Sequence, residues 1–462
     1  MKKYTAIFIG SFVLIICAIF IGACDDAGVI TPSVTPGKYN RSFKAGASDI
    51  MTSMSFVNDD GLVLGGYSSS IGAGGNDFYA TRLSSAGDVL WSKAYGQTGN
   101  EMSADVEETQ EGGYIMAGNT TSTGANGSDI LLVKTDANGN LQWAVDYVIP
   151  GDQFACSVVQ TADFGYLVCG YSNENPGSNN DILILKVNST GNFVSENLYG
   201  SPFNDIAYKM IKTSDGGFLV AGATYGFSGV NGDIYLLKIK SDMSFDWSNT
   251  YGGDGYDQAN SVVETSGHDF MIVGYTKSYG LTQGSMILFK TDHNGNVYTS
   301  EGWPRTIGDS SGFSEATSVL QETDNSFLIS GYTTNAAGAT FVSFEHYFNN
   351  SVFDYSRSYG PTTDNYKGVS MISIFGNFAV IGGNRTYGAG INDFFVLGMP
   401  DSSGKYVACL NDNGFNLKGG SPATFNAIAA PTQSFPPAAE TDLIPTLQVT
   451  LAGTIKSVNC GQ

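Results

Sequence analysis

The stretch TSDGGFLVAGATYGFSGVNGDIYLLKIKSDMSFDWSNTYG, residues 213–252, decides the fold of this chain. It opens with a glycine-rich turn at Asp215, runs through apolar residues to Gly222, and crosses a polar loop to a second apolar run that starts at Asp233. A further turn leads to a segment that carries Trp247. Short apolar runs joined by turns rich in glycine, asparagine and aspartate are typical of antiparallel β-strands. The stretch therefore predicts four short strands.

The same unit recurs along the chain with a fixed period. The glycine that ends the second strand returns every 52 residues, with one interval of 57, at Gly66, Gly118, Gly170, Gly222, Gly274, Gly331 and Gly383. The residue that opens the third strand recurs with these glycines, at Asp77, Asp129, Asp181, Asp233, Ser285 and Asp393. A fixed period of this length indicates a repeat architecture. We expect seven units over residues 38–410, with the extra residues of the long interval in the crossover around residues 308–312.

The pattern of apolar residues predicts how the units pack. First strands alternate between polar and apolar residues, as in residues 104–107, whereas second and third strands, such as residues 114–117 and 130–133, are continuously apolar. Continuously apolar strands are covered on both faces. Seven four-stranded meanders satisfy this by packing around an axis, so we predict an all-β, seven-bladed β-propeller of four-stranded antiparallel blades. A straight stack would need polar end repeats, and we see none.

The first residues of the repeat region match a fourth strand. Tyr39 and Phe43 lie 52 residues before Trp91 and Tyr95, so we expect residues 38–44 to complete the last blade. Residues 405–410 are the alternative for this closing strand. Trp91, Trp143 and Trp247 share one fourth-strand position, and we expect these tryptophans to pack between blades. Val194 and Tyr298 lie near the same position in other units.

The repeated pattern resembles that of a known group of proteins. Asp-Gly-Gly-aromatic, aliphatic-Ala-Gly-x-Thr, Asp-Ile-x-Leu-x-Lys, Gly-Asn-x-x-Trp and Tyr-Gly-Gly together look like the β-propeller repeats of exported bacterial and archaeal surface proteins. The resemblance covers about four fifths of the chain and implies the fold, but it implies almost no activity. The sixth and seventh units depart most, because residues 339–341 lack the aspartate and residues 375–377 replace the Asp-Gly-Gly turn.

The N-terminus reads as an export leader. Lys2 and Lys3 precede an apolar run over residues 6–20, and Ile21, Gly22 and Ala23 then lead to Cys24. This order resembles a prokaryotic lipobox, which implies a signal peptide over residues 1–23 and lipid on the Cys24 thiol. Residues 24–37 would then be a linker between the lipid and the propeller, and the protein would be membrane-anchored at the cell surface or facing the periplasm. An uncleaved membrane helix is the alternative.

The C-terminal residues leave the repeat pattern. Residues 411–462 hold five prolines and suggest an extended segment laid over the surface, with a last edge strand within residues 446–458. A disordered tail is the alternative. With Cys24 lipidated, four other cysteines remain after the leader, and an even number in an exported protein favours disulfides, which we pair as Cys156 with Cys169 and Cys409 with Cys460. Free thiols at Cys156 and Cys169 are the alternative.

Charge limits the partners. The chain has 22 Lys and Arg against 43 Asp and Glu, a net charge of −21. An acidic protein repels the phosphate backbone, so we expect no nucleic-acid partner. We expect the protein to contact the membrane through the lipid on Cys24. The charge is compatible with a protein or a glycan as partner, and we expect the protein to be a monomer.

Antiparallel order predicts an acidic face. The loops after second strands and the crossovers into first strands should share one end of the ring, which we call the long-loop face. That face would gather Asp77, Asp129, Asp181, Asp233, Asp393, Glu101, Asp205 and Asp257. We favour turn capping as their role, and a site for a cation or a basic ligand is the alternative. Residues 136–140 and 292–296 look like the front half of a calcium loop, but the glutamate of such a loop is missing and we favour hairpin turns for both segments. Ca²⁺ is the one cofactor that we consider.

The sequence holds no recognisable catalytic set. Our leading hypothesis is a non-enzymatic, lipid-anchored scaffold that binds a protein or glycan partner through the long-loop face. The alternative is an extracellular enzyme that acts on polysaccharide with paired carboxylates of that face.

Overall fold

The computed structural model describes most of the repeat region. The described residues are 41–43, 48–122, 127–173, 179–226, 231–308, 312–359, 365–374, 378–387 and 391–398, with four short strands between residues 418 and 459. Among these residues no helix is long and apolar enough to cross a membrane. The leader, Cys24, Cys409 and Cys460 lie outside the described residues.

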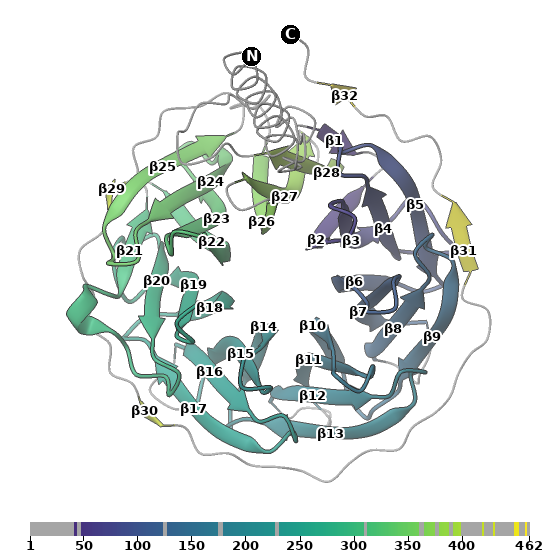
Figure 1. Cartoon of the computed structure of the whole chain (residues 1–462), viewed down its shortest axis with the longest axis horizontal. Coiled ribbons are helices and arrows are strands. Elements are labelled where there is room, and N and C mark those ends of the chain that lie inside the picture. Colours follow the sequence, from purple (N-terminus) through teal and green to yellow (C-terminus); the bar gives the residue numbers. More distant parts are fainter. Residues whose placement is uncertain are drawn as a thin grey trace, which may run out of the picture. The chain divides into compact units, whose positions relative to one another are not determined.

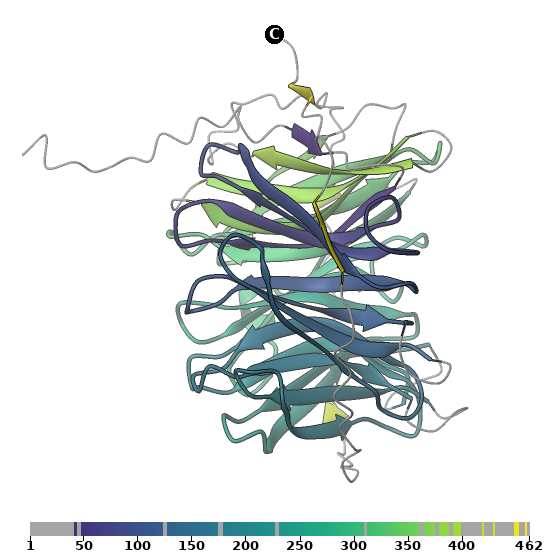
Figure 2. The ribbon, with the colours of Figure 1, turned by 90° about the vertical axis from the view of Figure 1, so that its right-hand side faces the viewer.

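The described strands form seven antiparallel sheets, which we number as blades 1 to 7 in chain order. Figure 1 shows the sheets side by side around a common axis, and Figure 2 shows the same ring edge-on. The ring is closed, because β2 of blade 1 contacts β26 and β28 of blade 7. The prediction of a seven-bladed propeller is confirmed. The strands, blade by blade, are β2 (Asp49–Phe56), β3 (Leu62–Ser68), β4 (Asp77–Leu83) and β5 (Val89–Gly96); β6 (Glu101–Glu108), β7 (Tyr114–Thr120), β8 (Asp129–Thr135) and β9 (Leu141–Tyr147); β10 (Gln153–Gln160), β11 (Tyr166–Ser172), β12 (Asp181–Val187) and β13 (Phe193–Tyr199); β14 (Asp205–Lys212), β15 (Phe218–Thr224), β16 (Asp233–Ile239) and β17 (Phe245–Tyr251); β18 (Asp257–Glu264), β19 (Phe270–Thr276), β20 (Ser285–Thr291) and β21 (Arg305–Gly308); β22 (Phe313–Gln321), β23 (Phe327–Thr334), β24 (Thr340–Tyr347) and β25 (Phe353–Tyr359); β26 (Asn365–Ile374), β27 (Phe378–Tyr387), β28 (Ile391–Gly398) and β1 (Arg41–Phe43).

The strand register fixes which loops share an end of the ring. In blade 4, Asp205 at the start of β14 pairs with Thr224, and Thr224 pairs with Asp233 at the start of β16. First and third strands therefore start at the same end, as expected for the long-loop face. The tight turns lie at the other end, where Gly216 adopts a φ of 82° that favours glycine.

Each first strand contains a β-bulge. In blades 1 to 7 the pairing of first and second strands shifts by one residue at the same place, as between Ala207 and Lys209 in blade 4. The extra residue is left out of the ladder. First strands are the innermost strands of the ring (Figure 1), so the bulge places one unpaired residue per blade beside the axis.

The bulge corrects the expected disulfide between Cys156 and Cys169. Cys169 pairs with Ser157, because Cys156 is the bulged residue and has no cross-strand partner. Both cysteines are free thiols, and Cys156 Sγ donates to the Cys169 carbonyl oxygen at 3.1 Å. The alternative of two free thiols describes the structure.

Aromatic rings pack between neighbouring blades. Trp91 packs edge-on against Tyr114 of the next blade, with ring centroids 5.5 Å apart, and Trp143 and Tyr166 repeat this contact at 5.9 Å. The expected inter-blade packing is confirmed for these tryptophans.

In blade 5 this packing position belongs to Trp303 and not to Tyr298, which lies near it in the sequence count. Trp303 is buried and lies 6.4 Å from Phe327, the residue in phase with Tyr114. The reason is that most of the extra residues of the 57-residue interval lie between β20 and β21, around the 3-10 helix η2 (Thr299–Glu301), and not in the crossover.

The N-terminal strand closes the ring, as predicted. Arg41 of β1 pairs with Val396 of β28, and Phe43 pairs with Phe394. Residues 405–410 lie outside the described residues. Four tail strands add to outer edges: β29 (Lys418–Gly419) on β21, β30 (Ile428–Ala429) on β17, β31 (Gln448–Leu451) on β5 and β32 (Val458–Asn459) on β1. The edge strand expected within residues 446–458 is β31.

Candidate functional site

The eight predicted carboxylates all belong to the long-loop end of their strands, but little of them is accessible. Asp181 is half-buried, and the other seven are buried, with relative exposures of 5% or less: Asp77, Asp129, Asp233, Asp393, Glu101, Asp205 and Asp257. The strands position them in inter-blade gaps and not as an open acidic ring.

These carboxylates accept hydrogen bonds from nearby loops. Glu101 accepts from the Gln97 amide at 2.6 Å and from the Thr120 hydroxyl at 2.7 Å. Asp205 accepts from the Ser201 amide at 2.5 Å, and Asp257 accepts from the Gly253 amide at 3.1 Å. Such bonds satisfy backbone donors that would otherwise be buried alone. Turn capping therefore accounts for Glu101, Asp205 and Asp257.

Carboxylates of adjacent blades meet behind a glycine. A Cβ atom on Gly252 would lie 1.9 Å from Asp233 Oδ1 and 2.9 Å from Asp257 Oδ2, so only glycine leaves room for this pair. Burial, together with the nearby Asp257, raises the pKa of Asp233 to about 6. Burial and the charge of Glu101 raise the pKa of Asp77 to about 6 as well. Close like charges in a dry site disfavour ionisation.

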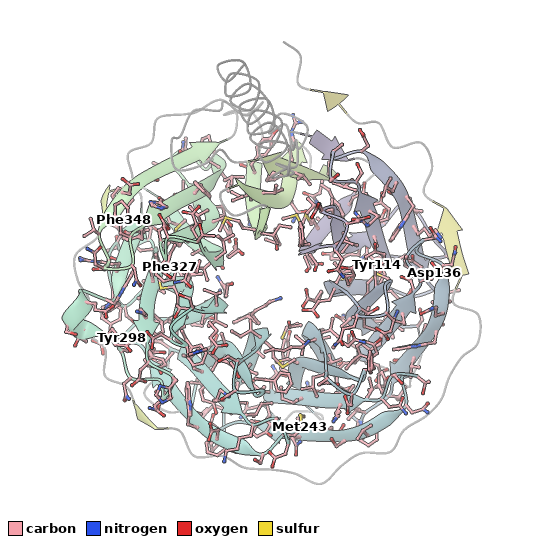
Figure 3. All side chains as sticks on the ribbon, in the orientation of Figure 1. Tyr114, Asp136, Met243, Tyr298, Phe327 and Phe348 are labelled. Carbon is pink, nitrogen blue, oxygen red and sulfur yellow. The ribbon has the colours of Figure 1, made fainter. Side chains whose placement is uncertain are left out.

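Nothing in the described part of the chain completes a cation site. Within it no three side chains of the His, Cys, Asp or Glu type converge as metal ligands. The two calcium-like segments are hairpin turns: Asp136 Oδ1 accepts from the amides of Asn138 and Asn140, both at 2.8 Å, and Asp292 has the same contacts with Asn294 and Asn296. Asp136 lies at the outer rim of the ring, away from the axis (Figure 3).

An arc of aromatic rings lies on blades 4 to 6 at the long-loop end. We define the aromatic arc as Tyr225, Tyr256, Tyr275, Phe313 and Tyr332. Successive ring centroids are 5.8, 6.3, 4.9 and 5.8 Å apart. Tyr275 is buried, and the other four side chains are partly exposed. The five residues come from strand ends and from the crossover before β18. Three consecutive blades thus form one row of rings that runs from Tyr225 to Tyr332, two residues 107 positions apart in the sequence.

A hydrogen-bonded group on the innermost strands borders the arc. We define the polar edge as Gln258 and Asn260 of β18 and Glu315 of β22. Glu315 Oε1 accepts from Gln258 Nε2 at 3.1 Å and from Asn260 Nδ2 at 2.9 Å. Two tyrosines of the arc join this network, because Tyr256 donates to Gln258 Oε1 at 2.6 Å and Tyr332 donates to Glu315. The network holds these polar atoms in fixed positions.

The arc and the polar edge make the ring asymmetric. The strand position held by Gln258 and Glu315 in blades 5 and 6 is apolar in blades 1 to 4, where it is Ile50, Met102, Phe154 and Ile206. In blade 7 it is Lys367, whose ammonium lies 4.6 Å from the centre of the Tyr332 ring. Partly exposed aromatic rings beside polar groups in fixed positions are typical of binding sites.

A second polar group ties blades together beside the axis. Asp105 of blade 2 accepts from Ser53 of blade 1 at 2.5 Å and from Ser157 of blade 3 at 2.9 Å. Lys209 of blade 4 reaches it at 3.2 Å. Burial and the Asp105 charge raise the pKa of Glu107 to about 7. These contacts occupy the Asp105 carboxylate, which leaves it poorly placed for chemistry on a ligand.

The sequence reasoning did not find the arc. Tyr275 and Tyr332 each follow the periodic glycine of the second strand, as do Tyr67 and Tyr171 in blades 1 and 3. This column of tyrosines was visible in the repeats. Tyr225 and Tyr256 lie in loops, and their approach depends on the closure of the ring.

Comparisons with known proteins add no assigned function. No protein-family model matches the chain, and no curated protein matches it. Among solved structures, a protein of unknown function from Dyadobacter fermentans is 15% identical with a TM-score of 0.40, over 63% of this chain and 91% of that one. Sqt1 from Chaetomium thermophilum is 8% identical with a TM-score of 0.39, over 82% and 89%. The α-L-arabinofuranosidase Arb93A from Fusarium graminearum is 10% identical with a TM-score of 0.35, over 65% and 93%.

Proposed function

We propose that this protein is a lipid-anchored, extracytoplasmic scaffold that binds a protein or glycan partner at the long-loop face. The observation that carries the proposal is the aromatic arc bordered by the polar edge. Rings that are partly exposed offer apolar contact, and the fixed amides and carboxylate offer hydrogen bonds that orient a partner. Cys24, acylated after export, would hold the propeller at the membrane, and residues 24–37 would let it reach its partner.

The alternative, an enzyme acting on extracellular polysaccharide, has weaker support. Such an enzyme needs two carboxyl groups that reach the same glycosidic bond, roughly 5 to 10 Å apart. The face carboxylates with raised pKa, such as Asp77 and Asp233, are buried and hold loops in place. Glu315 is the carboxylate of the polar edge, and it is engaged by three side chains.

A combined binding and hydrolysis screen tests the proposal. The full chain, purified in a detergent that contains no sugar, is applied to a glycan array and incubated with the same polysaccharides, and the products are separated by chromatography. We expect binding without release of shorter sugars. Turnover of any glycan that the chain binds would overturn the scaffold in favour of the enzyme.

A further inference from the structure

We propose that the aromatic arc and the polar edge form a subsite for an uncharged saccharide chain, which the arc contacts by stacking and the polar edge by hydrogen bonds to sugar hydroxyls. This inference rests on the scaffold function and names the class of partner.

The arc supplies the stacking surface. One face of a pyranose ring carries mostly C–H groups, which pack on the electron-rich face of an aromatic ring. Tyr256 and Tyr332 are partly exposed, whereas Tyr275 lies buried between Tyr256 and Phe313 and supports the row from within. Tyrosine side chains lose little conformational freedom on binding, because they have only two rotatable side-chain bonds. A series of adjoining rings therefore fits a chain of sugars better than a single small ligand.

The polar edge supplies hydrogen-bond acceptors in fixed positions. A sugar hydroxyl can donate its O–H group to such an acceptor. The four amide N–H groups of Gln258 and Asn260 already donate within the protein, so the atoms that keep a lone pair for sugar hydroxyls are Gln258 Oε1, Asn260 Oδ1 and Glu315 Oε2. Their mutual contacts at 2.8 to 3.1 Å fix the directions of these groups before a ligand arrives.

Local charge selects an uncharged ligand. Glu315 accepts a hydrogen bond from the Tyr332 hydroxyl, and the Lys367 ammonium lies over the Tyr332 ring, 4.6 Å from its centre. A basic peptide would meet this ammonium, which already occupies an aromatic face. An acidic polysaccharide would be repelled by the net charge of −21. A neutral saccharide meets neither penalty.

The test uses the full chain in a detergent without sugar and five neutral hexasaccharides as probes, with β-1,4-glucan, β-1,3-glucan, α-1,4-glucan, β-1,4-xylan and β-1,4-mannan backbones. Binding is measured by calorimetry at up to about 5 mM, since weak sugar binding has affinities near this range. A lysine-rich peptide serves as the competing class of ligand. The variants are Tyr256→Ala, Tyr256→Phe and Glu315→Gln. The matched control is Tyr67→Ala, which removes a partly exposed tyrosine from the same strand position as Tyr332 on the far part of the ring.

We expect at least one hexasaccharide to bind. Tyr256→Ala should weaken the affinity for that hexasaccharide about tenfold or more, because loss of an aromatic contact removes a large share of such binding. Tyr67→Ala should change the affinity by less than about twofold. Tyr256→Phe should keep most of the affinity, and unchanged melting temperatures would show that the variants are folded. Equal effects of Tyr256→Ala and Tyr67→Ala would overturn the subsite. If the peptide binds and no saccharide does, the saccharide subsite is wrong and the binding scaffold is still supported. If neither the peptide nor any saccharide binds, the saccharide subsite is wrong and the scaffold proposal is unaffected. Only turnover on the glycan array overturns the scaffold.

Discussion

A single buried carboxylate shows how the repeat tolerates exceptions. Asp146 of β9 is 3% exposed, and neither carboxylate oxygen has a hydrogen-bond partner among the described residues. Burial, and then the charges of Asp129 and Glu101, raise its pKa to about 7. The equivalent position is Leu198 in blade 3 and Thr250 in blade 4. The repeat therefore accepts an uncharged side chain here, and blade 2 carries a charge that its surroundings disfavour.

Asp146→Thr should stabilise the protein at pH 8. The folded-state pKa of Asp146 lies above the ordinary value near 3.9, so the aspartate favours folding below pH 4 and loses that contribution as the pH rises through 7. We expect a gain of about 1 to 2 kcal/mol at pH 8, reduced from the full linkage value because surrounding groups relax. The gain should fall to about a third of that value at pH 5 and disappear below pH 4, where the aspartate is protonated in both the folded and the unfolded state. Urea unfolding at pH 8 and pH 5 measures it.

The reverse substitution at the equivalent position, Thr250→Asp, is the control and should destabilise blade 4 more at pH 8 than at pH 5. A gain from Asp146→Thr that stays constant between the two pH values would contradict the assigned pKa. Asp77, Asp129 and Asp233, each with a pKa raised to about 6, should make the parent protein itself more stable at pH 5.5 than at pH 8.

At the scale of elements, tyrosine hydroxyls connect each fourth strand to the next blade. The hydroxyl of Tyr95 donates to the Gly139 carbonyl at 2.6 Å, and that of Tyr251 donates to the Gly295 carbonyl at 2.7 Å. Tyr147 and Tyr199 repeat the contact with residues 44 positions further along the chain. The acceptor lies in the turn between third and fourth strands, so one bond joins an outer strand to its neighbour's hairpin.

Tyr251→Phe should lower the free energy of unfolding by about 1 to 2 kcal/mol, because it removes one hydrogen bond and leaves the buried Gly295 carbonyl without it. Chemical denaturation with fluorescence detection measures the change. Tyr67→Phe is the control, since the Tyr67 hydroxyl has no such contact among the described residues, and it should change stability by less than about 0.5 kcal/mol. A loss of equal size in both variants would mean that the inter-blade bond contributes nothing of its own.

Element order was largely predictable, and local irregularities were not. The 52-residue period and the turn glycines predict the blades because each residue's local preference agrees with the repeated fold. The bulge that separates Cys156 from Cys169 leaves no mark in the sequence, since one unpaired residue keeps the period of the repeat. The place of Trp303 was missed because an insertion of a few residues can lie in either of two adjacent loops without changing the total spacing.

At the scale of the whole molecule, the candidate site was the least predictable part. The acidic end of the ring follows from strand direction alone. The aromatic arc needs the closure of seven blades, because Tyr225 and Phe313 belong to different blades and meet only through Tyr256 and Tyr275 between them. Sequence periodicity predicts what is common to all blades, whereas a binding site is made from what differs between them.

The lipid anchor is tested on whole cells. Cys24→Ser should move the protein from the membrane fraction to the soluble fraction, because a serine cannot receive the thioether-linked lipid that holds the chain to the bilayer. Fractionation followed by immunoblotting measures the distribution, and mass spectrometry of the parent N-terminus should find acylated Cys24. The control Cys17→Ser lies inside the leader and should leave the distribution unchanged. Retention of the Cys24→Ser variant with residues 1–23 still attached would favour an uncleaved helix.

The contacts of Asp105 constrain how this gene can evolve. Tandem repeats of similar sequence recombine readily, so copies are gained and lost over generations. Because Asp105 is matched to serines one blade away on each side and to Lys209 two blades away, an unequal exchange among the first four copies would strand a charge in the interior. Glu315 of blade 6 is matched in the same way to Gln258 and Asn260 of blade 5, so the copies that carry the aromatic arc are also tied to their order in the ring.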